Sequence, residues 1–298
     1  MAEGQIRQSL SGFYDVFSDG ELYRTRARGN FRKKRITPLV GDRVRFESSS
    51  PKEGYILEIL PRDNALTRPP VANIDQGVVV TAVASPEFST NLLDRQLIAL
   101  EVSHIKPVIY FTKTDLITDD RYQQFVTLAA AYRQVGYPVC LSREPFAQDG
   151  LDQLRTLLAD QETVIMGQTG AGKSTLLNHL VPDLDLATGE ISTALNRGRH
   201  TTRKVSLMPI AGGLVADTPG FSSYDTLTID YRELGQYFPE FRALASQCRF
   251  RGCVHVNEPG CAVKAALAAG DVLQSRYDNY LQLLTLLQNQ KPVYNKKK

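Results

Sequence analysis

Short alternations of apolar and polar residues run through the chain up to about residue 66, separated by turn-forming glycines and prolines. A period of two is typical of strands with one buried face, as in Asp42-Arg43-Val44-Arg45-Phe46. About five such strands in this length predict a small closed β-barrel, and a barrel of the oligonucleotide-binding (OB) type fits best.

A polar, proline-bearing stretch at residues 62–70 follows, and we interpret it as a linker. Beyond it, continuous apolar runs of the kind buried in a parallel sheet alternate with segments that have apolar residues at helical spacing. Strands are expected at 75–83, 106–111, 137–141 and 163–166, and helices at 92–101, 120–135, 151–158 and from 175. This alternation predicts a doubly wound α/β domain with right-handed crossovers.

The last part of the chain has a different pattern. A hairpin-like pair of strands is expected at 204–210 and 213–216, and an amphipathic helix at 277–287. We therefore divide the chain into a barrel at 1–66, an α/β domain at 67–225 and a mainly helical domain at 226–298.

The length of 298 residues agrees with about two or three domains. No uncharged apolar run approaches the length that spans a bilayer, and the N-terminal residues lack the pattern of a signal peptide. We expect a soluble, cytoplasmic protein without a membrane partner. The net charge of +3 is too small to indicate a nucleic-acid partner by itself.

Positive charge is concentrated within the predicted barrel. Residues 24–35 contain seven cations and no acid, namely Arg24, Arg26, Arg28, Arg32, Lys33, Lys34 and Arg35. The first three alternate, so they would share one strand face. This face is either a solvated surface or a binding site for nucleic-acid phosphates; we favour the second because the following loop is also basic.

The clearest motif is G-x-x-x-x-G-K-[ST], which lies between a predicted strand and a predicted helix. It consists of Gly167, Gln168, Thr169, Gly170, Ala171, Gly172, Lys173 and Ser174, with Thr175 following. Glycines allow backbone N–H groups to surround a polyphosphate, while the lysine reaches the outer phosphates and the serine hydroxyl can bind Mg²⁺. The motif predicts a phosphate-binding loop.

A second candidate segment directly follows the strand at 106–111. It reads Thr112-Lys113-Thr114-Asp115. Ligands of open α/β sheets bind beyond the carboxyl ends of strands, and an aspartate there can accept hydrogen bonds from both N1–H and the exocyclic amine of guanine. The alternative is a solvent-facing turn. Ser142, at the end of the next strand, is a further candidate whose backbone would meet the guanine carbonyl, although serine there also suits a cap or turn.

Two segments after the phosphate-binding loop complete the predicted nucleotide site. Asp217 ends an apolar strand and begins Asp217-Thr218-Pro219-Gly220, where the carboxylate would support Mg²⁺ and the N–H of Gly220 would contact the terminal phosphate. A basic loop at 196–203 places the hydroxyl of Thr201 or Thr202 within reach of the Mg²⁺ and the outer phosphate, unless it is only a disordered surface loop.

Three of the four cysteines gather near residue 250. Cys248, Cys253, His255 and Cys261 form C-x₄-C-x-H-x₅-C. Three thiolates and one imidazole make a complete tetrahedral set without an open position, which predicts structural rather than catalytic zinc. Buried free cysteines are the alternative, and disulfides are disfavoured because no export signal accompanies the cysteines.

The order of these motifs is unusual. In ordinary small GTPases the phosphate-binding loop comes first and the base-reading K-x-D segment comes late, whereas here Lys113 and Asp115 precede Gly167. This order indicates a circular permutation. A permuted GTPase domain between a small barrel and a Cys-Cys-His-Cys segment closely resembles the RsgA (YjeQ, YloQ) family of small-ribosomal-subunit biogenesis GTPases. The resemblance extends over nearly the whole chain and includes the segments at 198–202 and 217–222.

The resemblance implies an enzyme that hydrolyses GTP to GDP and phosphate, binds the small ribosomal subunit late in its maturation, and leaves after subunit-stimulated hydrolysis. It also implies that the barrel and the zinc domain contact ribosomal RNA. The cofactors would be one structural Zn²⁺, together with Mg²⁺ bound with GTP by Ser174 and Thr201. We expect a monomer.

Two residues depart from the usual GTPase pattern. Thr112 replaces the asparagine of N-K-x-D, which removes an amide that would bridge the base and the phosphate-binding loop, so we expect modest guanine affinity. Phe221 replaces a water-orienting glutamine after Asp217-Thr218-Pro219-Gly220, so intrinsic hydrolysis should be slow. We hypothesise that His200 positions the attacking water, while Lys173 neutralises the charge that develops on the phosphate oxygens.

Two other functions are compatible with parts of the sequence. One is a nucleotide-gated RNA-binding checkpoint module with negligible turnover, which a turnover measurement with and without small subunits would distinguish. The other is an ATP-dependent metabolic kinase, which would leave Lys113 and Asp115 without a purpose.

Overall fold

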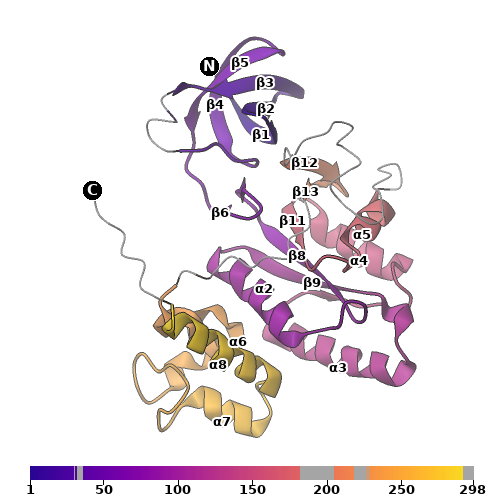
Figure 1. The fold of residues 1–298 in the computed structure, drawn as a ribbon, viewed down its shortest axis with the longest axis vertical. Coiled ribbons are helices and arrows are strands. Elements are labelled where there is room, and N and C mark those ends of the chain that lie inside the picture. Colours follow the sequence, from indigo (N-terminus) through magenta and orange to yellow (C-terminus); the bar gives the residue numbers. More distant parts are fainter. Residues whose placement is uncertain (30, 32–35, 182–204, 218–226, 228, 291–298) are drawn as a thin grey trace.

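The computed structural model describes residues 1–29, 31, 36–181, 205–217, 227 and 229–290 (Figure 1). A β-barrel lies at one end of the long axis, and an α/β domain and a helical domain lie side by side toward the other end (Figure 1). Among the described residues, we find no helix with the length and apolar character needed to cross a membrane.

Five strands close into the N-terminal barrel. They are β1 (Ala2–Leu10), β2 (Phe13–Ser18), β3 (Glu21–Ala27), β4 (Arg43–Ser50) and β5 (Glu53–Ile59). Their order is β1-β2-β3-β5-β4, β3 and β5 are parallel, and pairing of β1 with β4 closes the ring. Alternate residues such as Val16, Val44 and Ile56 fill the interior and are fully buried. The predicted five-stranded, OB-type barrel is therefore confirmed.

The segment that we interpreted as a linker joins β5 of the barrel to β8 of the α/β domain and is itself ordered. It contains the short paired strands β6 (Ala65–Leu66) and β7 (Val71–Ala72). Asn73 donates from its side-chain amide to the carbonyl of Gly41 at 2.9 Å, and Arg62 forms an ion pair with the fully buried Asp42 at 2.6 Å. The polar side chains of this segment therefore bond to the barrel rather than only to water.

The α/β domain contains a sheet with the strand order β10-β9-β8-β11-β13-β12. Its strands are β8 (Gln76–Ala82), β9 (Lys106–Thr112), β10 (Val139–Cys140), β11 (Glu162–Met166), β12 (Val205–Ile210) and β13 (Gly213–Asp217). The helices are α2 (Thr90–Val102), α3 (Asp119–Val135), α4 (Gln148–Leu158) and α5 (Lys173–Leu180), with a 3₁₀ turn η1 (Thr114–Leu116). All strand pairs are parallel except β12 with β13, which form the predicted hairpin.

Strand β8 lies at the centre of this arrangement and contributes to both faces of the sheet. Val79 packs into the cluster that includes α2 and α3, whereas Val78 and Val80 pack into the cluster with α4 and α5. A strand buried on both faces needs apolar residues at consecutive positions. This explains the continuous apolar run that predicted a parallel sheet.

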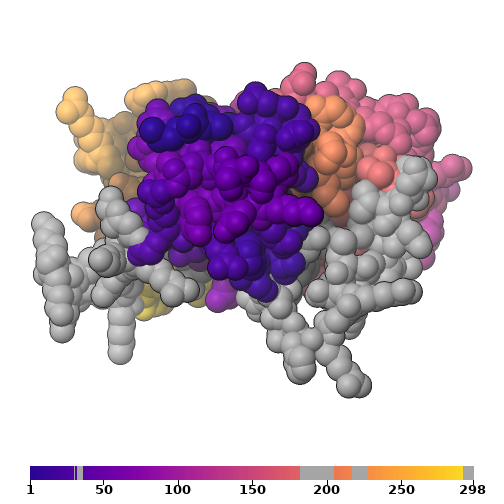
Figure 2. All heavy atoms as spheres, turned by 90° about the horizontal axis from the view of Figure 1, so that it is seen from above, coloured from indigo at the N-terminus to yellow at the C-terminus, as the bar shows by residue number. Residues whose placement is uncertain are grey.

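The barrel is joined to the α/β domain by backbone pairing. Beyond a bulge, β1 pairs antiparallel with the edge strand β12, with Gln8 opposite Ser206 and Ser9 opposite Val205. The two domains therefore share one sheet of 11 strands. Nearby, the amide of Gln5 donates to a carboxylate oxygen of Glu162 at 2.7 Å. Seen from above, the barrel lies against the segment that contains β12 (Figure 2).

The C-terminal domain is helical, as predicted. It comprises η3 (Tyr231–Tyr237), α6 (Pro239–Leu244), η4 (Ala245–Gln247), α7 (Ala262–Ala269) and α8 (Gln274–Gln288). Helix α8 packs against α2 of the α/β domain. Its apolar face, including Tyr280, Leu283 and Leu284, is buried in the C-terminal core, as the amphipathic pattern predicted.

A buried polar network fixes the C-terminal domain on α2. The fully buried Arg276 of α8 forms ion pairs with Asp94 of α2 and with Glu240 of α6, each at 2.7 Å. Asp94 also accepts hydrogen bonds from Tyr132 at 2.7 Å and Asn279 at 2.6 Å. Buried charges of this kind persist only where partners satisfy them, so the network favours one docking geometry of the domain.

Candidate nucleotide site and metal cluster

The predicted phosphate-binding loop connects β11 to α5, as the motif requires. Gly167 has φ 142°, and a Cβ atom at this position would lie 2.1 Å from the carbonyl oxygen of Val80 on β8. Gly172 has φ 92° and caps the N-terminus of α5. The close approach of β8 therefore requires glycine at position 167, and the left-handed backbone favours glycine at position 172.

Lys173 lies within the loop and is 4% exposed. Its ammonium donates to the carbonyl oxygens of Gly167 and Gln168, both at 2.8 Å. Burial lowers the pKa of Lys173 to about 8, because the charged form loses hydration. A phosphate group within reach of this ammonium would favour its charged form. The neighbouring Ser174, at the start of α5, is also buried.

The base-reading candidates lie at the same edge of the sheet as the phosphate-binding loop. Thr112 ends β9 and is fully buried, and its hydroxyl donates to the carbonyl of Ala171 in the loop at 2.6 Å. We predicted that Thr112, in place of asparagine, removes an amide that would bridge the base and the phosphate-binding loop. The Thr112 hydroxyl keeps a contact with the loop but offers no amide to the base, so modest guanine affinity stays a prediction.

Lys113, Thr114 and Asp115 follow in the turn after β9. Lys113 has a left-handed backbone (φ 60°), and its ammonium donates to the carbonyl of Ser85. Thr114 is buried. Asp115 lies in η1 and is exposed, so its carboxylate is accessible to a ligand.

Ser142 follows β10 at the same edge of the sheet. Its hydroxyl lies 3.4 Å from a carboxylate oxygen of Asp149, near the start of α4. A Cβ atom on Gly150 would lie 2.5 Å from this hydroxyl. The side chain therefore packs against the first turn of α4, while a backbone contact with guanine stays a prediction.

Asp217 is the last residue of β13, which lies beside β11 in the sheet. The candidates His200, Thr201, Thr202, Gly220 and Phe221 lie outside the described residues. The described part thus brings Thr112, Lys113 and the loop around Lys173 together at one edge of the sheet.

Sequence reasoning missed one segment of this site, the connection between β8 and α2. Ser85 accepts from Lys113, and a Cβ atom on Gly170 would lie 3.8 Å from Pro86. This segment therefore borders both the base-reading turn and the phosphate-binding loop. Its sequence, Ser85-Pro86, indicates only a turn, so no local signal could have identified it.

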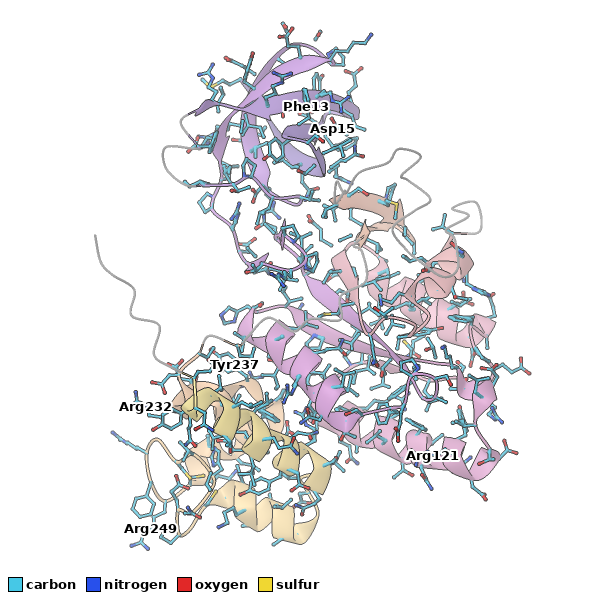
Figure 3. The ribbon with its side chains drawn as sticks, viewed as in Figure 1. Phe13, Asp15, Arg121, Arg232, Tyr237 and Arg249 are labelled. Atoms are coloured by element: carbon cyan, nitrogen blue, oxygen red, sulfur yellow. The ribbon has the colours of Figure 1, made fainter. Side chains whose placement is uncertain are left out.

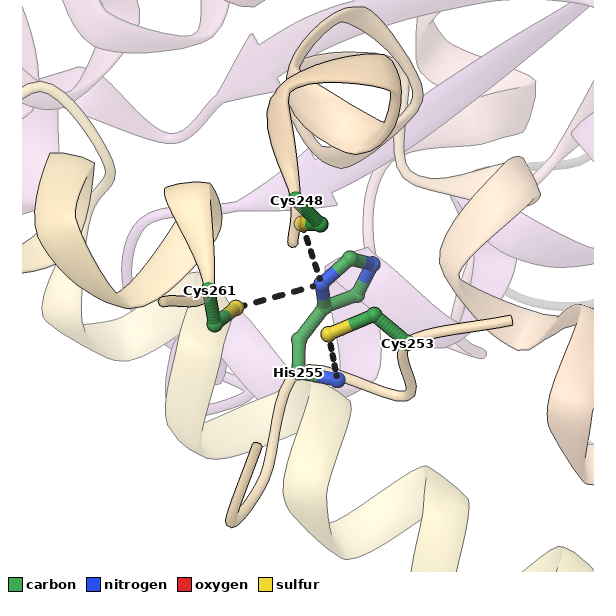
Figure 4. A group of neighbouring side chains, drawn as sticks. All are labelled: Cys248, Cys253, His255 and Cys261. Carbon is green, nitrogen blue, oxygen red and sulfur yellow. Dashed lines mark hydrogen bonds between the residues drawn. The ribbon is translucent and has the colours of Figure 1, made fainter. Parts of the chain in front are cut away.

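The four predicted metal ligands meet in the C-terminal domain (Figure 4). Ligand atoms of Cys248, Cys253, His255 and Cys261 all lie within 4.8 Å of one another. Nδ1 of His255 is 3.7 Å from Sγ of Cys248 and 3.4 Å from Sγ of Cys261. Tetrahedral zinc bonds of ordinary length place nitrogen and sulfur ligands about 3.6 Å apart. The cluster therefore has the size and donor set to hold a metal ion.

Neighbouring groups hold these ligands in place. The hydroxyl of Tyr277 donates to the carbonyl of His255 at 2.7 Å, and the hydroxyl of Tyr280 donates to that of Val254 at 2.7 Å. The carboxylate of Glu258 accepts backbone N–H bonds from Val254 and Val256 at 2.8 and 2.9 Å. Burial lowers the pKa of His255, which favours the neutral imidazole that metals bind. Hydrogen bonds to the backbone of residues 254–256 thus fix the conformation of the loop that carries His255.

A mostly parallel sheet, in which the candidate base-reading segment after β9 precedes the G-x-x-x-x-G-K-[ST] loop after β11, defines the class of protein as a circularly permuted P-loop GTPase. The RsgA GTPase family profile matches residues 59–227, and the RsgA N-terminal domain profile matches residues 3–56. The chain belongs to the RsgA GTPase family.

Curated relatives agree over the full length. The chain is 66% identical to "Small ribosomal subunit biogenesis GTPase RsgA 1" of Lactiplantibacillus plantarum, with 100% of both chains covered. It is 55% identical to the protein named "Small ribosomal subunit biogenesis GTPase RsgA" of Enterococcus faecalis, covering 99% of this chain and 98% of the relative.

Solved structures show the same fold. The crystal structure of YloQ, described as a circularly permuted GTPase, has a TM-score of 0.81 at 44% identity and covers 99% of this chain and 97% of its own. The crystal structure of YjeQ from Thermotoga maritima has a TM-score of 0.82 at 32% identity, with 97% and 99% covered. The resemblance inferred from the motifs is confirmed.

Replacing Thr112 by valine should weaken GDP binding about 5- to 30-fold. The carbonyl of Ala171 loses its hydrogen-bond donor, and leaving a buried acceptor unsatisfied costs about 1–2 kcal/mol. Thr112→Ser keeps the hydroxyl and is the matched control, with affinity close to that of the parent protein. Isothermal titration calorimetry with GDP measures both. A loss in Thr112→Ser as large as that in Thr112→Val would contradict the prediction, because it would show that the hydroxyl alone does not maintain the affinity.

Nucleotide binding should be coupled to protonation of Lys173. With a pKa of about 8 before binding, this lysine is half deprotonated at pH 8, so binding GDP should take up about half a proton. Burial lowers the pKa of Lys173 in the folded protein, so between about pH 8 and the ordinary lysine pKa the unfolded chain binds more protons than the folded one. The free energy of unfolding should therefore rise with pH over this range. Calorimetry at pH 8 in two buffers of different ionisation enthalpy measures the uptake. Lys173→Met should abolish it, and an unchanged uptake in this variant would assign the proton elsewhere.

Proposed function

We propose that the protein is a GTPase that binds the small ribosomal subunit, assists its late maturation and leaves after subunit-stimulated hydrolysis. The observation that carries this proposal is the permuted GTPase domain flanked by a barrel and a Cys₃His domain, over the full length of relatives named small ribosomal subunit biogenesis GTPases. The names of these relatives favour an enzyme over a checkpoint module with negligible turnover. The Lys113–Asp115 turn favours GTP over the ATP of a metabolic kinase.

The nucleotide would lie along one edge of the sheet. Backbone N–H groups of the loop and the ammonium of Lys173 would hold the phosphates, with the base at Thr112–Asp115 and Ser142. Mg²⁺, held by Ser174 and Thr201 with Asp217 behind them, would supply charge neutralisation at the β and γ phosphates. Gly220 would contact the γ phosphate through its N–H.

Positioning of water is the remaining requirement of hydrolysis. Phe221 cannot accept or donate a hydrogen bond through its side chain, so another group must orient the attacking water. We propose His200 for this role, because it precedes Thr201 and Thr202 in the sequence.

The barrel and the C-terminal domain would contact ribosomal RNA from the two ends of the molecule (Figure 1). We propose structural zinc for the Cys₃His cluster, since three thiolates and an imidazole leave no position for a substrate. We also propose that the protein is a monomer that acts on the ribosome in the cytoplasm, without a membrane partner.

GTP turnover should be slow for the protein alone and rise many-fold with purified small subunits. Phosphate release with small subunits, large subunits or neither measures this. His200→Ala should lower stimulated turnover by about 10²-fold or more while leaving GDP affinity unchanged, as expected for loss of a positioned catalytic group. A flat response of the parent protein to small subunits would favour the checkpoint module, and full activity of His200→Ala would remove this residue from the mechanism.

Removal of the metal should selectively destabilise the C-terminal domain. Elemental analysis should give one zinc per chain, and Cys261→Ser should lose it and unfold the domain at lower temperature, since structural zinc contributes folding energy. Cys140→Ala, which changes a buried cysteine of the α/β domain, is the matched control and should keep its zinc. Full zinc content in Cys261→Ser would refute the proposed ligand set.

A further inference from the structure

An arginine side chain is bonded to the turn that carries Asp115. Arg143 directly follows Ser142 in the loop after β10, and β10 pairs in parallel with β9, so this loop lies beside the turn after β9. Its Nη1 donates to the carbonyl of Thr114 at 2.5 Å, and its Nη2 donates to the carbonyl of Ile117 at 3.2 Å. One guanidinium group therefore bonds the backbone on both sides of Asp115.

The turn itself is short and open to solvent. The 3₁₀ turn η1 spans only Thr114–Leu116, and a backbone hydrogen bond from Leu116 to the carbonyl of Lys113, at 3.1 Å, closes it. The side chains of Asp115 and Leu116 are exposed. A single 3₁₀ turn has poor hydrogen-bond geometry and is a weak structure by itself. The direction of the Asp115 carboxylate therefore depends on the groups that hold the flanking carbonyls.

Arg143 is itself held by the first helical turns of α3. Its Nε and Nη2 donate to one carboxylate oxygen of Asp119 at 3.0 and 2.9 Å, and its guanidinium lies 5.4 Å from the centre of the Tyr122 ring. The Asp119 side chain is 88% exposed, so this ion pair contributes little stability. Its effect is geometric, because the planar guanidinium has five N–H donors in fixed directions and can bond several acceptors at once.

Recognition of guanine depends on the direction of a carboxylate. Asp115 can accept hydrogen bonds from both N1–H and the exocyclic amine only if its oxygens lie along the edge of the base. Hydrogen bonds weaken steeply when they are misaligned, so displacement of the carboxylate would weaken both of them. Hypoxanthine has N1–H but lacks the exocyclic amine, so it would lose only one. A residue that fixes the turn should therefore affect guanine more than hypoxanthine.

We propose that Arg143 is a positioning residue for guanine specificity. It acts through Asp115 rather than on the nucleotide: it holds the carbonyls of Thr114 and Ile117 so that the carboxylate faces both donors of guanine. Attraction between a cation and the phosphates, in contrast, would act alike on nucleotides that differ only in the base. The inference rests on the proposed function in taking Asp115 as the residue that reads guanine, and it adds the residue that orients Asp115.

The test compares GDP with inosine diphosphate (IDP), whose base is hypoxanthine, by isothermal titration calorimetry. The parent protein should bind GDP about 10- to 100-fold more tightly than IDP, the range for one hydrogen bond to a charged group. Arg143→Ala should weaken IDP binding about 3-fold and GDP binding about 10-fold, because one and two hydrogen bonds lose their alignment. Arg143→Lys keeps the charge but replaces the fork of donors by one ammonium, so its GDP preference should fall as in the alanine variant.

Arg121→Ala provides the matched control. Arg121 is an exposed arginine in the first turn of α3 (Figure 3). Its guanidinium donates to Gln124 at 2.6 Å and lies 5.4 Å from the centre of the Phe125 ring, and both of these contacts are within α3. Its removal takes away the same charge close in sequence to the same turn and should leave the GDP preference unchanged. Thermal unfolding of each variant shows whether the α/β domain is intact.

The outcomes separate this inference from the proposed function. Equal losses for GDP and IDP in folded Arg143→Ala, an unchanged preference in that variant, or the parent preference in Arg143→Lys would overturn the positioning role alone. Asp115→Ala tests the base-reading assignment, and its preference for GDP over IDP should disappear. If Asp115→Ala kept the parent preference, or if the parent protein had none, the base-reading assignment in the proposed function would fail together with this inference.

Discussion

The candidate nucleotide site depends on the parallel pairing of β8 with both β9 and β11. This pairing places the end of β9, with Thr112, beside the end of β11, where the phosphate-binding loop begins. The carbonyl of Val80 approaches the loop so closely that only glycine fits at position 167. The hydroxyl of Thr112 links the end of β9 to the loop by donating a hydrogen bond to the carbonyl of Ala171. Thr112 and Ala171, 59 residues apart in sequence, thus lie on one surface because the buried strand β8 lies between their strands.

The permuted order allows the sheet to keep this geometry while other domains attach to its ends. The barrel strand β1 adds to the free edge of β12, and the C-terminal helix α8 packs on α2. Both joints lie close to elements of the site, because β12 pairs with β13, which ends at Asp217, and α2 follows the segment that contains Ser85. Attachment at these places brings the flanking domains into contact with the elements that surround the nucleotide site.

The sequence was sufficient to predict the barrel, the permuted α/β domain and the metal cluster, because each has a short-range pattern. Alternation with a period of two predicted the barrel strands, and the glycine-rich motif predicted the loop. The metal ligands were predicted from the spacing of Cys248, Cys253, His255 and Cys261. The role of Thr112 as a donor to Ala171 could not be predicted, because it depends on how far β9 lies from the loop. The ordered segment at 62–74 was likewise missed, since its polar residues bond to distant backbone groups.

The two domain interfaces are held by different interactions, so they should respond differently to amino-acid substitution. The barrel joint is a backbone ladder between β1 and β12, so most side-chain changes leave its hydrogen bonds intact, whereas proline would remove a donor. The C-terminal joint depends on side chains, because Arg276, Asp94 and Glu240 are buried and satisfy one another. Loss of one partner leaves a buried charge without compensation, which costs about 3–5 kcal/mol. Sequence variation is therefore better tolerated at the barrel joint than at the interface of α8 with α2, where each charged residue is needed by the others.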